Sequence, residues 1–93
     1  MMTPEEILEQ ARIGRVVAVL KEGLAPLLER TETVREDNTS IAGLIRTLRI
    51  GDHLLVQERT PEGDHFVRRV ASEGAAQRFV EARLADYERM WDG

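Results

Sequence analysis

HLLVQERTPEGDHFVRRVA, residues 53–71, consists of two apolar segments joined by a Thr-Pro-Glu-Gly turn at residues 60–63. Proline at the second position of a type I turn, followed by a glycine in the left-handed region, is typical of a three-residue hairpin loop. The sequence therefore predicts a β-hairpin with strands over 53–59 and 65–71. All four aromatic residues of the chain lie in this hairpin or in the segment after it, so we expect the bulky part of the core here.

The hairpin register sorts the side chains onto two faces. Pairing Thr60 with Asp64 and counting back places one largely apolar set against the core, namely Leu54, Val56, Phe66 and Val70. The other face is mostly polar and is expected to meet solvent. It supplies the candidate partner-binding residues Gln57, Arg59, His65 and Arg69. A hairpin alone is marginal in water, so we expect it to pack on helices, on a second copy, or on both.

A C-terminal amphipathic helix is predicted from Ser72, a good N-cap, to about Trp91. Its apolar residues recur at intervals of three or four, the spacing that places them on one helix face: Ala76, Val80, Leu84, Tyr87 and Trp91. Charged residues occupy the other side of this helix.

The N-terminal segment predicts a long helix over residues 4–22. Thr3 can cap it, Pro4 suits the first helical position and Glu6 stands where a capping-box carboxylate belongs. Apolar residues fall on more than one side of this helix, so we expect a second subunit to cover part of it.

A kink or break and then a connector are expected after residue 22. Gly23 and Pro26 predict a kink or break, with the helix continuing to about residue 30. Residues 31–39 are polar and rich in turn formers, which predicts a connector. A short helix over 41–49 follows, because its apolar residues recur at helical spacing. A strand over 44–50, which would make a three-stranded meander, is the alternative.

The expected fold class is α+β, and the chain is expected to be dimeric. Its elements would be a long N-terminal helix kinked or broken near Gly23–Pro26, a short helix, a β-hairpin and a C-terminal amphipathic helix. We expect one small domain over residues 1–93. Within it, residues 4–30 would form a helical arm, residues 31–39 the connector and residues 40–92 a helix–hairpin–helix unit.

Composition excludes several kinds of site. The chain has 93 residues and no cysteine, so disulfides and thiolate metal sites are ruled out. Its longest apolar run, Val16–Leu20, is far shorter than the roughly 20 residues of a membrane span, and no signal-peptide pattern opens the sequence. We therefore expect a cytoplasmic protein with no membrane partner. A net charge of −4 weighs mildly against a protein that coats nucleic acid.

The histidines and serines are the candidates for chemistry. His53 and His65 each follow an aspartate, which suggests a metal or acid–base site. The hairpin register places them at opposite ends, roughly 20 Å apart, so a structural role is expected, with a site completed by another subunit as the alternative. Ser40 and Ser72 fit helix caps better than nucleophiles. The sequence thus predicts no catalytic residue, metal ligand or cofactor, and no enzyme.

The predicted order of elements resembles winged helix-turn-helix proteins over residues 24–91. In that family the helix before the hairpin enters the major groove and the hairpin tip contacts the DNA backbone. The resemblance implies Arg46 and Arg49 as DNA-binding residues of the reading helix, and Arg59, His65 and Arg69 along the wing. The chain departs from the family in its longer polar connector, where a turn of about 3–4 residues is usual, and in its acidic total charge.

The leading functional prediction is a small non-catalytic binding or regulatory module. It would self-associate through its helices and present the polar hairpin face to a protein partner. The candidate oligomer interface consists of Ile13, Val17, Leu20, Leu24, Tyr87 and Trp91. A dimeric winged helix-turn-helix-like DNA-binding regulator is the alternative.

Overall fold

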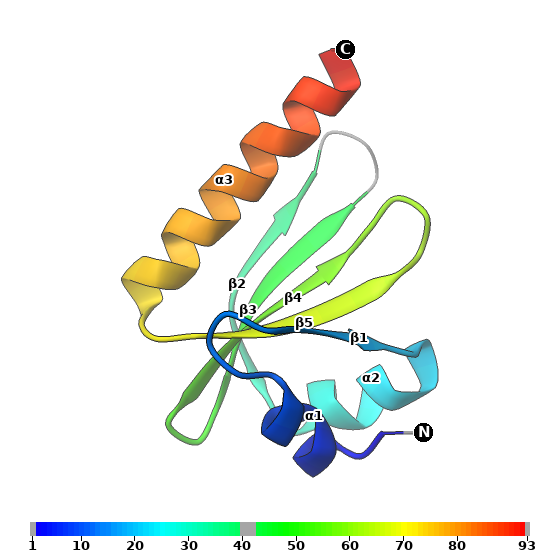
Figure 1. Ribbon diagram of the computed structural model, residues 1–93, viewed down its shortest axis with the longest axis vertical. Helices are drawn as coiled ribbons and strands as arrows, with labels where there is room; N and C mark the ends of the chain where they lie inside the picture. Colours follow the sequence, from blue (N-terminus) through cyan, green and yellow to red (C-terminus); the bar gives the residue numbers. More distant parts are fainter. Residues whose placement is uncertain (1, 40–42, 93) are drawn as a thin grey trace.

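The computed structural model of the protein describes residues 2–39 and 43–92. At its centre is a five-stranded antiparallel sheet with the strand order β1-β5-β4-β3-β2. The strands in Figure 1 are β1 (Val16–Val19), β2 (Glu32–Asn38), β3 (Leu44–Ile50), β4 (His53–Arg59) and β5 (His65–Val70). The helices are α1 (Pro4–Gln10), α2 (Lys21–Glu29) and α3 (Glu73–Asp92).

The β4–β5 pairing has the predicted register. The Thr60 backbone N–H donates to the carbonyl of Asp64 at 2.9 Å, and Gly63 takes the expected left-handed φ of 94°. Leu54 lies opposite Val70. The prediction of a separate hairpin is nevertheless wrong, because β4 also pairs with β3 and β5 also pairs with β1.

The short helix predicted over 41–49 is also wrong where the structure describes it. Residues 44–50 form β3, and the two-residue turn Gly51–Asp52 joins it to β4 with Ile50 opposite His53. Both sides of β3 carry buried residues. A strand that is covered on both faces has apolar residues at both odd and even positions. In β3 the apolar residues Leu44, Ile45 and Leu48 therefore recur at intervals that also fit a helix. The predicted cap Ser40 lies outside the described residues.

The long N-terminal helix is a third correction. Only the capped first turns form as predicted, with Thr3 and Glu6 making both capping-box hydrogen bonds. The chain then turns at Gly14, with a φ of 85°, into β1 and afterwards into α2. The four residues of β1 are three valines and an alanine, and exposed and buried residues alternate along the strand. Valine is β-branched and favours the strand conformation. The predicted break is absent, since α2 is continuous through Gly23 and Pro26.

The predicted polar connector 31–39 is largely strand β2. This strand is the outer edge of the sheet next to β3, and six of its seven residues are exposed. A register shift between Thr33 and Arg35 marks an irregularity in its pairing. An edge strand with charged side chains has the composition of a loop, which explains the error.

The sheet is covered on both faces, and each face has its own core. We call the faces by the helices that cover them (Figure 1). The α1/α2 face is packed around Ile7, Val17, Val19, Leu24, Leu27, Leu48, Leu55 and Val67. The α3 face is packed around Ile45, Val56, Ala76, Val80 and Tyr87. The fold-class prediction is therefore wrong in its arrangement, although the mixture of helices and antiparallel strands it named is present.

The α1/α2 cover buries a face that was expected to meet solvent. The polar hairpin face lies largely under α1 and α2, and Gln57 is 0% exposed.

The connection from β1 to β2 runs through α2, which carries the chain from one edge of the sheet to the other. No helix within residues 2–39 and 43–92 has both the length and the apolar character that crossing a membrane requires.

Candidate functional site

A groove opens on the α3 face between β1 and α3, and we call it the β1–α3 groove. Its volume is about 290 Å³, and it is lined by Val16, Glu58, Thr60, Phe66, Arg68 and Arg83. The sheet register places these residues together, because β5 pairs with both β1 and β4. Arg68 lies opposite Val16 on one side, and Phe66 lies opposite Glu58 on the other.

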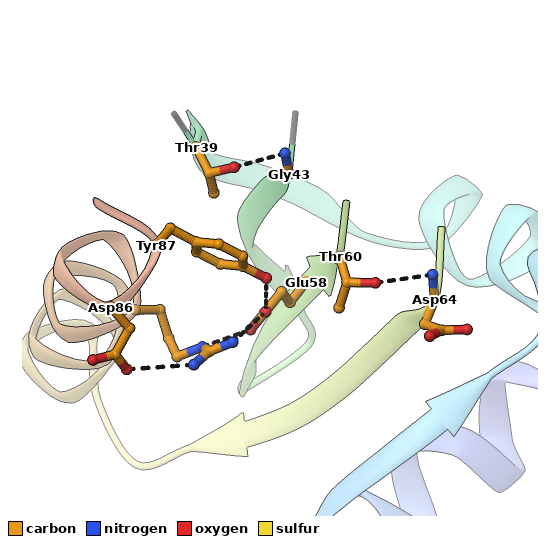
Figure 2. Close-up of polar contacts among 8 residues, drawn as sticks. Thr39, Gly43, Glu58, Thr60, Asp64, Asp86 and Tyr87 are labelled. Atoms are coloured by element: carbon orange, nitrogen blue, oxygen red, sulfur yellow. Dashed lines mark hydrogen bonds and ion pairs between the residues drawn. The ribbon is translucent and has the colours of Figure 1, made fainter. Parts of the chain in front are cut away.

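Glu58 is the buried carboxylate of this groove, with an exposed fraction of 4%. Arg83 of α3 binds it through two hydrogen bonds, from Nε to Oε1 at 3.1 Å and from an Nη to Oε2 at 2.7 Å. The Tyr87 hydroxyl donates to the same Oε2, as Figure 2 shows. A bidentate guanidinium–carboxylate pair fixes orientation as well as charge. These contacts attach α3 to the middle of the sheet.

The protonation states of this cluster follow from burial and charge. Burial alone would raise the pKa of Glu58, but the hydrogen bonds from Arg83 and Tyr87 and the positive charges nearby outweigh it and lower the pKa. Burial and the Glu58 carboxylate raise the pKa of Tyr87 to about 12. At neutral pH Glu58 is therefore ionised and Tyr87 carries its proton.

Arg83 is fully engaged within the protein. Besides Glu58 it contacts Asp86 at 3.4 Å, and its guanidinium lies 5.0 Å from the centroid of the Tyr87 ring. The hydrogen bonds to Glu58 raise the pKa of Arg83. Its charge is thus balanced by two carboxylates.

Arg68 differs from Arg83 in its partners. Its guanidinium stacks over the Phe79 ring, 4.1 Å from the centroid. Among the side chains described, those of residues 2–39 and 43–90, none makes an ion pair with Arg68. Burial lowers the pKa of Arg68, while the charge of Glu58 acts in the opposite direction. The groove therefore contains a guanidinium that is oriented but not neutralised.

A second polar group crosses the α1/α2 face as a row of four side chains, one from each of β2, β3, β4 and β5. Arg46 donates to Glu36 at 2.7 Å and to the Gln57 carbonyl at 3.5 Å. The Gln57 amide nitrogen lies 3.4 Å from Nδ1 of His65. Burial and the charges of nearby basic residues, first Arg59, lower the pKa of His65. Arg46 and His65 thus provide polar contacts for the fully buried side-chain amide of Gln57.

The structure brings together some of the predicted partner-binding residues and separates others. Gln57 and His65 are in this row, and Arg59 is exposed opposite His65 at the end of β4. Arg69 lies further along β5, opposite Leu55. The predicted face is therefore exposed only at its Arg59 end.

The arginines predicted for DNA binding are both ion-paired on the sheet. Arg46 contacts Glu36, and Arg49 contacts Glu73 at the start of α3. Both lie on β3 rather than on a helix.

The candidate interface residues also divide. Ile13 and Leu20 are exposed beside β1, whereas Val17, Leu24 and Tyr87 are buried within the chain. Trp91 lies in the last turn of α3, and its side chain is outside the description.

The two histidines occupy the positions that the register predicted. His53 begins β4 and His65 begins β5, at opposite ends of the antiparallel pair. Nδ1 of His53 is buried without a hydrogen-bond partner among the described residues. In the same part of the chain no three His, Asp or Glu side chains are grouped as a metal site would need.

Sequence reasoning missed Glu58, Arg68 and Arg83 as a group. The hairpin register does place Glu58 and Arg68 on the same face as Leu54 and Val70. Two charged residues on a core-facing side are a signal, because buried charges need partners. The partner Arg83 could be found only once α3 was known to cross this face.

Comparisons of the chain with protein-family models, with curated proteins and with solved structures found no match. The functional conclusion therefore rests on the chemistry of the two polar groups and on the exposed surface around β1.

Proposed function

We propose that the protein is a non-catalytic binding module that acts as a homodimer, with the subunits joined through β1. The difference between the two sheet edges supports this. β2 exposes Glu32, Arg35 and Glu36, and charged side chains protect an edge from pairing with other strands. β1 contains only valine and alanine, so its edge lacks that protection.

Exposed apolar residues gather around the unprotected edge. Ile13 is 66% exposed, Val16 45% and Leu20 70%, and these three residues lie just before, in and just after β1. Grouped apolar surface of this kind marks interfaces. A second copy fits because two antiparallel edge strands related by a two-fold axis form one continuous sheet with self-complementary contacts.

The remaining parts of the proposal concern the cellular role. The module would work in the cytoplasm and would meet a protein partner through the exposed Arg59 end of the hairpin. The helix that suggested DNA binding is strand β3, so no observation favours a winged-helix regulator. The DNA-binding alternative is tested by the ratio of absorbance at 260 and 280 nm during size-exclusion chromatography, which reports whether nucleic acid copurifies with the protein. A ratio typical of protein alone would count against it.

The dimer is tested with Leu20→Asp. Leu20 is the N-cap of α2 and makes no side-chain capping bond, whereas aspartate is among the best N-cap residues. The variant therefore removes exposed apolar surface while improving the helix start by about 1 kcal/mol. We expect size-exclusion chromatography with light scattering to show a dimer for the natural sequence and a folded monomer for Leu20→Asp.

Val34→Asp is the matched control, because Val34 is an exposed apolar residue on the opposite edge strand. This variant should remain dimeric. A natural sequence that is monomeric at about 100 μM, well above the micromolar dissociation constants of ordinary specific interfaces, contradicts the proposal. A Leu20→Asp protein that stays dimeric contradicts the assignment of the interface to β1.

A further inference from the structure

We propose that the β1–α3 groove is a binding site for a small aliphatic carboxylate, with Arg68 as the residue that holds the carboxylate group. This site goes beyond the dimer proposed above and shares one side chain with it, Val16 of β1. It rests on three features of the groove: its unbalanced charge, the fixed orientation of Arg68, and the size and apolar lining of the space beside it.

Charge balance identifies the kind of group that the groove accepts. Three charged side chains line it, namely Glu58, Arg68 and Arg83. Glu58 is already bound by Arg83 through two hydrogen bonds and acts on Arg68 only through its charge. Arg68 is half-buried and has no carboxylate at hydrogen-bond distance among the described side chains. Because a partly desolvated charge is unfavourable without a counter-charge, an incoming anion stabilises this arrangement.

The stacking of Arg68 prepares it for a planar anion. Phe79 supports one face of the guanidinium at 4.1 Å, a contact that does not use the N–H groups along the edge. A guanidinium presents its donors as a planar fork that matches the two oxygens of a carboxylate. The stacking restricts the side chain, so binding costs less conformational entropy than it would with an unsupported arginine.

Glu58 selects against more highly charged anions. Its ionised carboxylate lies in the same groove, and its charge is felt by Arg68. A phosphate dianion would meet repulsion from Glu58 with only one unpaired guanidinium to offset it. A carboxylate meets half of that repulsion, because it carries a single negative charge, and this charge is matched by the single charge of Arg68.

Size and lining define the rest of the ligand. The groove volume of about 290 Å³ is at the lower end of the range of about 300–1,000 Å³ for ligand sites. Val16, opposite Arg68 on β1, and Phe66, two residues before Arg68 on β5, provide apolar walls. The ligand therefore has a short hydrocarbon body, which could belong to a free acid or to the C-terminal residue of a chain.

The experiment is a titration followed by two-dimensional amide NMR. Hexanoate and N-acetyl-leucine are the probes for a free acid and a chain end, and hexanamide is the uncharged control. We expect one or both acids to shift the amide signals of Val16, Phe66 and Arg68 with a dissociation constant of the order of 1 mM. Hexanamide should leave these signals unchanged. Binding of either acid supports the site, and the tighter acid identifies the source of the carboxylate.

Matched variants separate this groove from general charge effects. Arg68→Gln should weaken binding about tenfold or more, the loss expected for a hydrogen bond to a charged group. Arg69→Gln removes the same charge from the next residue on the opposite face of the strand, and should bind like the natural sequence. Thermal unfolding of both variants confirms that they are folded.

Three results would overturn the site. The first is that neither acid shifts the amide signals at about 50 mM, far above the expected dissociation constant. The others are that Arg68→Gln binds the acids as tightly as the natural sequence does, or that Arg69→Gln weakens binding as much as Arg68→Gln does. The Leu20→Asp variant separates this test from that of the dimer, because Leu20, unlike Val16, does not line the groove. A monomeric Leu20→Asp protein should therefore still bind the acids.

Discussion

Glu58 illustrates what a charged side chain needs on the inner face of a strand. Its two oxygens receive donors from Arg83 and Tyr87, so the buried carboxylate keeps its charge. About a third of the Arg83 side chain is exposed, so solvent screening reduces the contribution of the Arg83–Glu58 pair to stability. The clearest effect of Glu58 is therefore on the protonation of its neighbours.

The Tyr87 phenol provides a direct measurement of this cluster, because it is the only tyrosine in the chain. Burial and Glu58 raise its pKa from 10.0 to about 12. In Glu58→Gln the negative charge is gone, and we expect the pKa to fall toward 10. Phenolate absorbance against pH measures both proteins. The exposed Glu62→Gln variant should leave the pKa unchanged, and an equal effect of the two variants would refute the contact.

The raised pKa also fixes how stability depends on alkaline pH. The unfolded chain loses the Tyr87 proton near pH 10.0 and the folded chain only near pH 12. The contribution of Tyr87 is therefore complete below pH 10 and is lost as the pH rises toward 12.

His65 gives the corresponding prediction on the acid side. Burial and the neighbouring positive charges lower its pKa below 6.5 in the folded state, so the unfolded chain binds a proton first. The free energy of unfolding should fall as the pH drops below 6.5 and level off below the folded pKa. Urea unfolding at several pH values measures this. His65→Gln should flatten the decline in this range, and an unchanged slope would contradict the role of His65.

Among the elements, those with strong local signals were predictable from the sequence. The β4–β5 register followed from the turn at residues 60–63, and the N-terminus of α1 followed from its capping box. The apolar spacing after Ser72 predicted a helix where α3 lies. In each case residues close in sequence determine the structure, so no knowledge of the rest of the molecule is needed.

Of the other strands, only β3 was anticipated, as the alternative strand over 44–50; β1 and β2 were missed, because the patterns of these strands depend on what covers them. β3 carries buried residues on both faces and so imitates a helix, while β2 lies at a charged edge and imitates a loop. β1 is short and apolar and adjoins a true helix, α2. Only the complete sheet distinguishes these cases.

The β3–β4 turn offers a prediction at the scale of one element. Gly51 has a φ of 56°, and a Cβ built there would meet no atom within 4 Å. Gly51→Ala should therefore destabilise the fold through backbone strain alone, by about 1 kcal/mol, measured by thermal or urea unfolding. Asparagine tolerates the left-handed region, so Gly51→Asn should lose less. Equal losses would indicate that backbone conformation does not limit this turn.

At the scale of the whole molecule, the candidate sites were only partly visible in the sequence. Gln57 and His65 were identified from the hairpin, but their burial and their link to Arg46 required the α1/α2 cover. The β1–α3 groove joins three parts of the chain that are distant in sequence. The assignment of residues 1–93 to a single domain stays a prediction.

The position of β1 has a consequence for how the chain folds during synthesis. β2, β3, β4 and β5 form a meander in which each strand pairs with the next, whereas β1 pairs with β5, which follows it in the chain by about 45 residues. Short-range hairpins close faster than contacts between distant segments. During synthesis β1 must therefore wait, unpaired and apolar, until β5 emerges. In that interval the β5 strand of a neighbouring nascent chain is an equally good partner, so crowded polysomes are where strand exchange between copies would begin.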